Sequence, residues 1–167
     1  MLVLEITMAS NGSWDALFDL KIEFLAYIIS FIVCFNYWNY NHNLFALVNR
    51  IDGKVIWIVA LAMFFTSLIP YLSHFVANNF NSFMAQACYG IAFMVIVFTS
   101  IITSEQLKRV DSANIALLMA LKNHIPLYSM IIVVGIGIVI GYLFYPPAVI
   151  ISCMLSIILV WLIPKLR

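Results

Sequence analysis

Five long apolar runs, almost free of charged residues, constrain this chain more than any other feature. They lie near residues 22–40, 55–72, 83–103, 126–144 and 148–163. A helix that crosses a bilayer needs about 20 mainly apolar residues, so the first four runs are long enough and the fifth is short but adequate. Only 9% of the residues are charged, against about 25% in soluble domains. The sequence therefore predicts an all-α integral membrane protein.

A shorter apolar segment precedes these runs. Residues 1–8 are apolar but too few to span a bilayer. Residues 9–20 form a polar, acidic connection with an Asn-Gly-Ser turn signal at 11–13. We interpret residues 1–8 as the end of a helix whose start is absent. The expected fold is a single transmembrane domain, a helical bundle of five full transmembrane helices plus an N-terminal stub of a sixth.

Turn-forming residues separate the runs. Asp52 and Gly53 predict a turn before the second run. Pro126 suits the first position of the fourth helix, and the Pro146-Pro147 pair predicts a tight break after that helix. These signals favour short connections between antiparallel helices.

Two features of the second half leave alternatives open. Residues 112–121 are mostly apolar, and they predict either a short interfacial helix on the inner leaflet or an early start to the fourth span, interrupted before Pro126. Gly137 and Gly141 are four residues apart, a spacing that permits close helix contact, although the pair could equally face lipid.

The distribution of basic residues predicts the orientation. Loops that alternate along the chain hold one lysine or arginine on one side of the membrane and seven on the other. Cytoplasmic loops carry the excess of basic residues, so the richer side is expected to be cytoplasmic, together with the C-terminus. The seven are Arg50, Lys54, Lys108, Arg109, Lys122, Lys165 and Arg167.

The sequence offers no set of residues typical of catalysis or metal binding. The three histidines lie at or near the ends of apolar runs, and no His-Glu-x-x-His motif occurs. The three cysteines are far apart in apolar runs, which favours small packed side chains over disulfides or metal ligands. The net charge of +1 gives no electrostatic case for nucleic acid. We expect no enzyme activity, no cofactor, no metal site and no nucleic-acid partner.

The stretch from residue 35 to 45 is the most polar and aromatic part of any run. It contains four asparagines, and its Trp38 and His42 share a helix face because they are four residues apart. Such residues at a membrane edge often form an aromatic belt. A belt does not require amides, however, so a hydrogen-bonded junction with a neighbouring helix is the second interpretation. The candidate residues are Tyr37, Trp38, Asn41 and His42.

The first half of the chain carries a family resemblance. The matching residues are Met1–Ile6, Trp14–Leu17, Phe24–Phe31, Tyr37-Trp38, His42, Leu44-Phe45, Arg50–Asp52 and Leu68–Pro70. In this order and spacing they resemble bacterial members of the transmembrane protein 175 family. The second half is similar in span number and loop placement only.

The resemblance implies a multi-pass subunit of a homotetrameric, potassium-selective cation channel in the bacterial plasma membrane, with proton channel activity in lysosomal relatives. Its partners would be potassium ions and the lipid bilayer. In that family the first helix lines the pore, provides a hydrophobic constriction and begins with Arg-x-x-x-Phe-Ser-Asp. This motif would precede Met1, so Leu2 and Leu4 would be what remains of the pore lining.

The resemblance also assigns a role to the residues singled out above. The Trp and His of the second helix support the pore helix, which places that role on Trp38 and His42, with Tyr37 and Asn41 beside them. Where relatives often have two adjacent histidines, this chain has Asn41-His42. The alternative function is a non-conducting truncated membrane scaffold or assembly partner.

Overall fold

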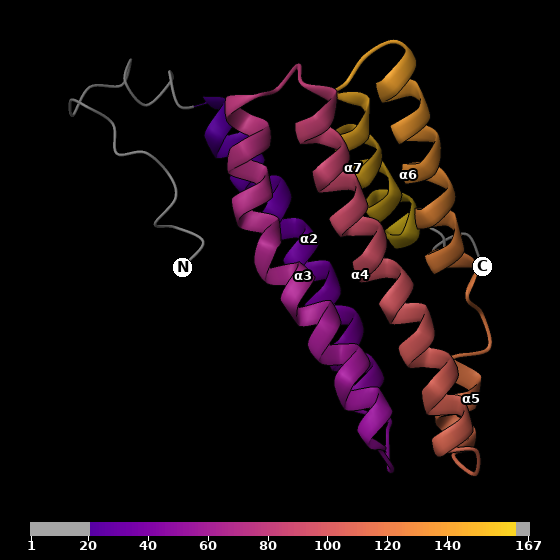
Figure 1. The fold of residues 1–167 in the computed structure, drawn as a ribbon. Coiled ribbons are helices and arrows are strands. Elements are labelled where there is room, and N and C mark those ends of the chain that lie inside the picture. The colour runs from indigo at the N-terminus through magenta and orange to yellow at the C-terminus, as the bar shows by residue number, and fades with distance from the viewer. Residues whose placement is uncertain (1–20, 163–167) are drawn as a thin grey trace.

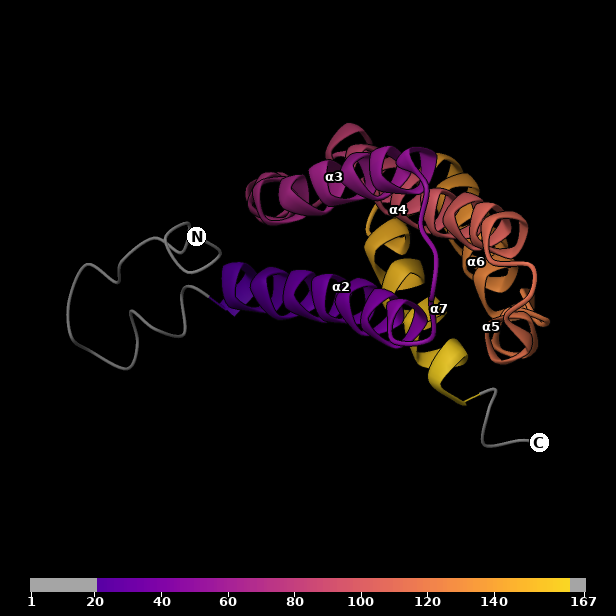
Figure 2. The same ribbon diagram turned by 90° about the horizontal axis from the view of Figure 1, so that it is seen from below.

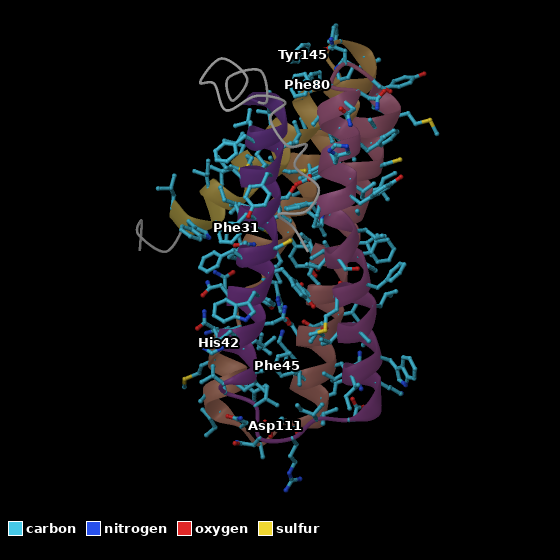
Figure 3. The ribbon with its side chains drawn as sticks, turned by 90° about the vertical axis from the view of Figure 1, so that its left-hand side faces the viewer. Phe31, His42, Phe45, Phe80, Asp111 and Tyr145 are labelled. Carbon is cyan, nitrogen blue, oxygen red and sulfur yellow. The ribbon has the colours of Figure 1, made fainter. Side chains whose placement is uncertain are left out.

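The computed structural model describes residues 21–162, and every regular element within that range is a helix (Figure 1). The helices are α2 (Lys21–Phe45), α3 (Gly53–Asn78), α4 (Phe83–Val110), α5 (Ile115–Ala120), α6 (Ile125–Leu143) and α7 (Ala148–Leu162). The long helices run up and down the bundle in turn. As a result Phe45 and Asp111 lie at one end, and Phe80 and Tyr145 lie at the other (Figure 3).

Helix α4 is the centre of the bundle. It packs against α3, α6 and α7, and it contributes more buried residues than any other described helix. Tyr89, Phe93 and Ile96 of α4 lie in one apolar core with Ile69 of α3 and Val134 of α6. Viewed along the bundle in Figure 2, α7 lies between α2 on one side and α4 and α6 on the other.

A second apolar cluster closes the end of the bundle that contains Asp111. It joins Leu44 of α2, Val55 of α3, Leu107 of α4 and Leu117 of the short helix α5. Helix α5 is separate from α6, because the chain turns at residues 121–124 between them. The structure thus contains a short helix followed by a break before Pro126, and whether that helix lies on the inner leaflet or begins the fourth span stays a prediction.

Three stretches within residues 21–162 are long and apolar enough to cross a membrane: Gly53–Asn78, Phe83–Val110 and Ile115–Leu143. Helix α7 is apolar but shorter, and α2 is not among the three. All five runs expected to span overlap with helices, while the number that cross the bilayer stays a prediction. Five basic residues are described at or near the end of the bundle that contains Asp111: Arg50 in the α2–α3 loop, Lys54 at the start of α3, Lys108 and Arg109 in the last turn of α4, and Lys122 between α5 and α6.

The close packing of α6 on α7 requires glycine at positions 137 and 141. A Cβ atom at Gly137 would collide with the side chain of Ser152, and one at Gly141 would lie 2.7 Å from Val149 Cγ2. Val149 also approaches α4, where a Cβ at Gly90 would lie 2.6 Å from its Cγ1. The glycine pair thus faces a neighbouring helix, in the manner of small residues in membrane helices.

Short hydrogen-bonded caps hold the turns. Asp52 caps α3 by accepting a 2.9 Å hydrogen bond from the Val55 N–H, as the turn prediction at this position requires. At the other end of the bundle, the Ala148 N–H donates to the Tyr145 carbonyl across the Pro146-Pro147 break at 2.9 Å.

A buried carboxylate ties the α2–α3 loop to the end of α4. Asp111 is 4% exposed, and its Oδ2 accepts hydrogen bonds of 2.9 Å from the Asn114 side chain and from the Asn49 N–H. Asn114 also donates to the Leu47 carbonyl at 2.7 Å and caps α5. These bonds, led by the one from Asn114, hold the pKa of Asp111 below its ordinary value.

The glycine contact can be tested by adding one methyl group. Gly137→Ala should lower the free energy of unfolding by about 1–3 kcal/mol, because overpacking forces the neighbouring helix to move. Gly135→Ala is the matched control, since nothing lies within 4 Å of its added Cβ, and it should be neutral or slightly stabilising. Thermal unfolding in detergent measures both variants, and equal midpoints would contradict the packing described.

The Asp111 linkage predicts a pH dependence of stability. Because the folded pKa is lowered, the stability from this carboxylate is present above the unfolded pKa of about 3.9 and is lost as the pH falls through the folded pKa. Asp111→Asn should therefore lower the thermal midpoint at pH 7, and its difference from the native protein should shrink below about pH 4. Ser112→Ala, an exposed neighbour, is the control. A difference that stays constant from pH 7 to pH 3 would count against the linkage.

Candidate functional site

The polar and aromatic stretch of α2 is helical to its end at Phe45. A helix turns by 100° per residue, so residues that are adjacent in this stretch point in different directions. The four predicted site residues consequently divide between an exposed face and a buried face. They do not form one constellation.

The exposed face of α2 is a continuous row of rings, here named the α2 aromatic face: Phe31, Phe35, Trp38 and His42. Trp38 is 56% exposed, and its ring stacks on that of His42 with centroids 4.9 Å apart and planes 14° apart. Phe35 lies 6.0 Å from Trp38 and 6.3 Å from Phe31, centroid to centroid. Figure 3 shows Phe31 and His42 on the side of α2 turned away from α3. The two rings stack on each other, and Trp38 is more than half exposed in the described part of the chain.

Tyr37 and Asn41 face other directions. Tyr37 is 9% exposed and belongs to the central core. The Asn41 side chain donates a 2.9 Å hydrogen bond to the Tyr37 carbonyl on its own helix.

The hydrogen bonds from this stretch to other helices come from residues that the sequence reasoning did not select. The Tyr40 hydroxyl and Ser104 Oγ of α4 are 2.6 Å apart. The Trp161 indole of α7 donates to Asn36 Oδ1 at 3.2 Å. A helical wheel places Asn36 and Tyr40 on one side of α2, but which helix lies opposite depends on the packing of the whole bundle.

Asn39 and Asn43 bond within α2 in the structure. The Asn43 side chain donates to Asn39 Oδ1 at 3.3 Å. Of the four amides that suggested a junction between helices, only Asn36 makes such a bond among the described residues. Within the described residues, Asn36 is thus the one amide of the four that links α2 to another helix, and a junction with a helix outside them stays a prediction.

A polar cluster lies beside the α5–α6 turn. Glu105 Oε1 is 2.8 Å from both Lys108 Nζ and His124 Nε2, and Lys108 also approaches His124. The sequence reasoning placed His124 at a membrane edge and gave it no partner. The signal available was the pair of charges at residues 105 and 108, one helical turn apart at the end of an apolar helix.

Leu2 and Leu4, expected to line a pore, lie outside the described residues 21–162. Within that range, no group of three or more His, Cys, Asp or Glu side chains is arranged to hold a metal ion.

Comparison with known proteins gives two matches. Residues 1–70 match the family model described as the endosomal/lysosomal potassium channel TMEM175. Over 167 residues the chain is 30% identical to a protein named potassium channel HX13_20290 from Chryseobacterium sp. (strain P1-3), and the match covers 100% of this chain and 86% of the relative. No solved structure matches the chain significantly.

Proposed function

The chain belongs to the endosomal/lysosomal potassium channel TMEM175 family, and on this premise we propose that it is a subunit of a potassium-permeable cation channel. The observation that carries the proposal is the similarity to a bacterial potassium channel along the whole chain. The family is a channel family, which agrees with the absence of a catalytic set from the sequence.

The chemistry of the helices supports a channel over a coupled transporter. Transporters and pumps usually keep ionisable residues inside the membrane, where they are costly and functional. Helix α3 is uncharged after Lys54, α6 and α7 hold no Asp, Glu, Lys or Arg, and α4 is uncharged up to Glu105. We therefore propose that ions pass a hydrophobic constriction in the oligomer, with potassium selectivity and any proton permeation arising there. Leu2 and Leu4 are the proposed contribution of this chain to the lining.

The α2 aromatic face is the proposed support for the pore-lining helix. Its Trp38 and His42 rings are stacked on each other and largely uncovered by the described part of the chain. A fixed, amphipathic aromatic pair with a free outer surface is suited to bind a neighbouring helix at little entropic cost. A homotetramer around one central pore is the assembly proposed from the family, and in it this face would be covered.

The proposed orientation follows from the basic residues. Arg50, Lys54, Lys108, Arg109 and Lys122 come from one end of the bundle, and cytoplasmic loops are the ones enriched in lysine and arginine. We place that end at the cytoplasmic side of a bacterial plasma membrane, with the C-terminus on the same side.

Potassium flux is the direct test of the proposed function. Liposomes containing the protein as encoded in its genome, loaded with potassium and given an outward gradient, should lose potassium faster than empty liposomes. Replacing potassium by sodium should slow the flux if the constriction is selective. Folded, reconstituted protein that gives no potassium flux would reject the channel proposal and would instead favour a non-conducting scaffold or assembly partner.

The supporting role of Trp38 predicts a position-specific loss. Trp38→Ala should reduce potassium flux and the fraction of assembled oligomer by about tenfold or more, because aromatic anchors at interfaces contribute about 2 kcal/mol or more. Trp57→Ala on α3 is the matched control, since Trp57 is 79% exposed and lies outside the α2 aromatic face. Equal effects of the two variants on flux and assembly would show that the α2 aromatic face does not have this role.

A further inference from the structure

The end of the bundle that contains Asp111 carries more positive than negative charge. Five basic and three acidic residues are described there, whereas residues 79–82 and 144–147 at the other end contain no charged residue. The three acidic side chains already have partners. Asp52 caps α3, Glu105 is paired with Lys108, and Asp111 is buried and hydrogen-bonded. They therefore leave much of the basic charge unpaired.

Four of the basic side chains at this end are exposed and make no ion pair within residues 21–162: Arg50, Lys54, Arg109 and Lys122. The first three are here named the basic edge. Arg50 and Lys54 lie two residues to either side of Asp52, and Arg109 lies in the last turn of α4. Exposed cations that are not paired within a protein attract anions from its surroundings.

Hydrogen bonds hold the two parts of the basic edge together. The Gln106 side chain donates to Asp52 Oδ2 at 3.0 Å, and the Asn49 N–H donates to Asp111 Oδ2 at 2.9 Å. Both bonds join the α2–α3 loop to the end of α4. Between these anchor points lie Arg50 and Arg109. The backbone that carries both arginines is therefore fixed, and a ligand would not have to order it.

A hollow of about 260 Å³ opens at the basic edge. It lies between the α2–α3 loop and residues 110–114, and Arg50 is the basic residue in its wall. The Asp111 carboxylate also lines it, but that carboxylate accepts hydrogen bonds from Asn49 and Asn114. The hollow therefore offers an unpaired guanidinium group, which is suited to bind a phosphate group.

The basic edge lies at the depth of lipid headgroups. Helix α3 has 26 residues and α4 has 28, so at 1.5 Å per residue they are roughly 39 Å and roughly 42 Å long. The hydrocarbon core of a bilayer is about 30 Å thick, so both helices are long enough to extend beyond it. Lys54 is in the first turn of α3 and Arg109 is in the last turn of α4. In a bilayer these positions lie in the headgroup layer.

Exposed apolar side chains adjoin the basic edge. Ile51 directly follows Arg50 and is more than half exposed. On α5, Ile115 and Met119 are four residues apart on one face, and both are more than half exposed. Asn114, which precedes Ile115, lines the hollow. Apolar side chains beside cations match the acyl chains and the headgroup of an anionic lipid, whereas a soluble phosphate would use only the cations.

We propose that the basic edge binds an anionic phospholipid. The phosphate group of the lipid interacts with Arg50 at the hollow, and the charges of Lys54 and Arg109 add to the attraction. Its acyl chains contact the exposed apolar residues of the loop and of α5. In the orientation proposed above, this lipid belongs to the inner leaflet, where clusters of lysine and arginine recognise anionic headgroups.

Lipid selectivity is the direct test. The protein as encoded in its genome is reconstituted in nanodiscs with equal amounts of palmitoyl-oleoyl-phosphatidylglycerol and palmitoyl-oleoyl-phosphatidylcholine, which have the same acyl chains. Native mass spectrometry of the released protein counts the bound molecules of each lipid. The native protein should retain phosphatidylglycerol in clear excess. Retention of the two lipids in equal amounts would overturn the proposal.

Charge-removing variants locate the site. Arg50→Gln should lower the preference for phosphatidylglycerol about fivefold, as expected when one cation is lost at a membrane surface. Lys21→Gln is the matched control, because it removes the same charge at the start of α2, at the opposite end of the bundle, and it should keep the preference. Arg50→Gln combined with Lys54→Gln and Arg109→Gln should remove the preference. Equal losses in Arg50→Gln and Lys21→Gln would overturn the proposal.

A soluble competitor separates a lipid from a free phosphate. An excess of glycerol phosphate, which carries the phosphate group without acyl chains, should not displace the lipid, and displacement would overturn the assignment to a phospholipid. Thermal unfolding checks the fold of each variant. Should the triple variant not fold, the comparison of Arg50→Gln with Lys21→Gln decides. Neither orientation nor ion flux enters these measurements, so a failure here can be told apart from a failure of the channel proposal.

Discussion

Hydrocarbon offers no hydrogen bonds, and this single property of the solvent governs the structure of the subunit. Peptide groups within a bilayer must pair inside their own segment, and every regular element in residues 21–162 is accordingly a helix. The same demand extends to side chains. Thr99, Ser100 and Ser152 each donate to a backbone carbonyl three or four residues earlier on their own helix. Polar residues can therefore lie in the core of the bundle, where their small size lets the helices approach.

The features that could be predicted from the sequence are those encoded within a few residues. Apolar runs between turn signals placed the five long helices, and Asp52 and the Pro146-Pro147 pair marked breaks that the structure contains. The pairing of Asp111 with Asn49 could not be predicted in this way, because the two residues are 62 positions apart. Their contact depends on how two loops meet after the helices have packed.

In the candidate site, too, local features could be predicted from the sequence and long-range contacts could not. A spacing of four residues was sufficient to place Trp38 beside His42, and their rings are stacked. Composition could not show that Asn41 and Asn43 bond within their own helix. The direction in which Tyr37 and Tyr40 point relative to α4 required the packed bundle. Membership of a channel family was inferred from the order and spacing of many short sequence matches. No single contact in the structure could have indicated that family.

The attachment of α2 has a mechanical consequence. Helix α3 packs along the length of α4. Helix α6 packs along the length of α7, where Gly137 and Gly141 allow a close approach. On its other flank, α2 meets α7 near Asn36 and Trp161, with a cavity beside that contact. Because α2 packs closely on α3 and only loosely on α7, α2 can tilt while the other helices keep their positions. Since α2 also carries the α2 aromatic face, a small tilt would displace any helix bound to that face.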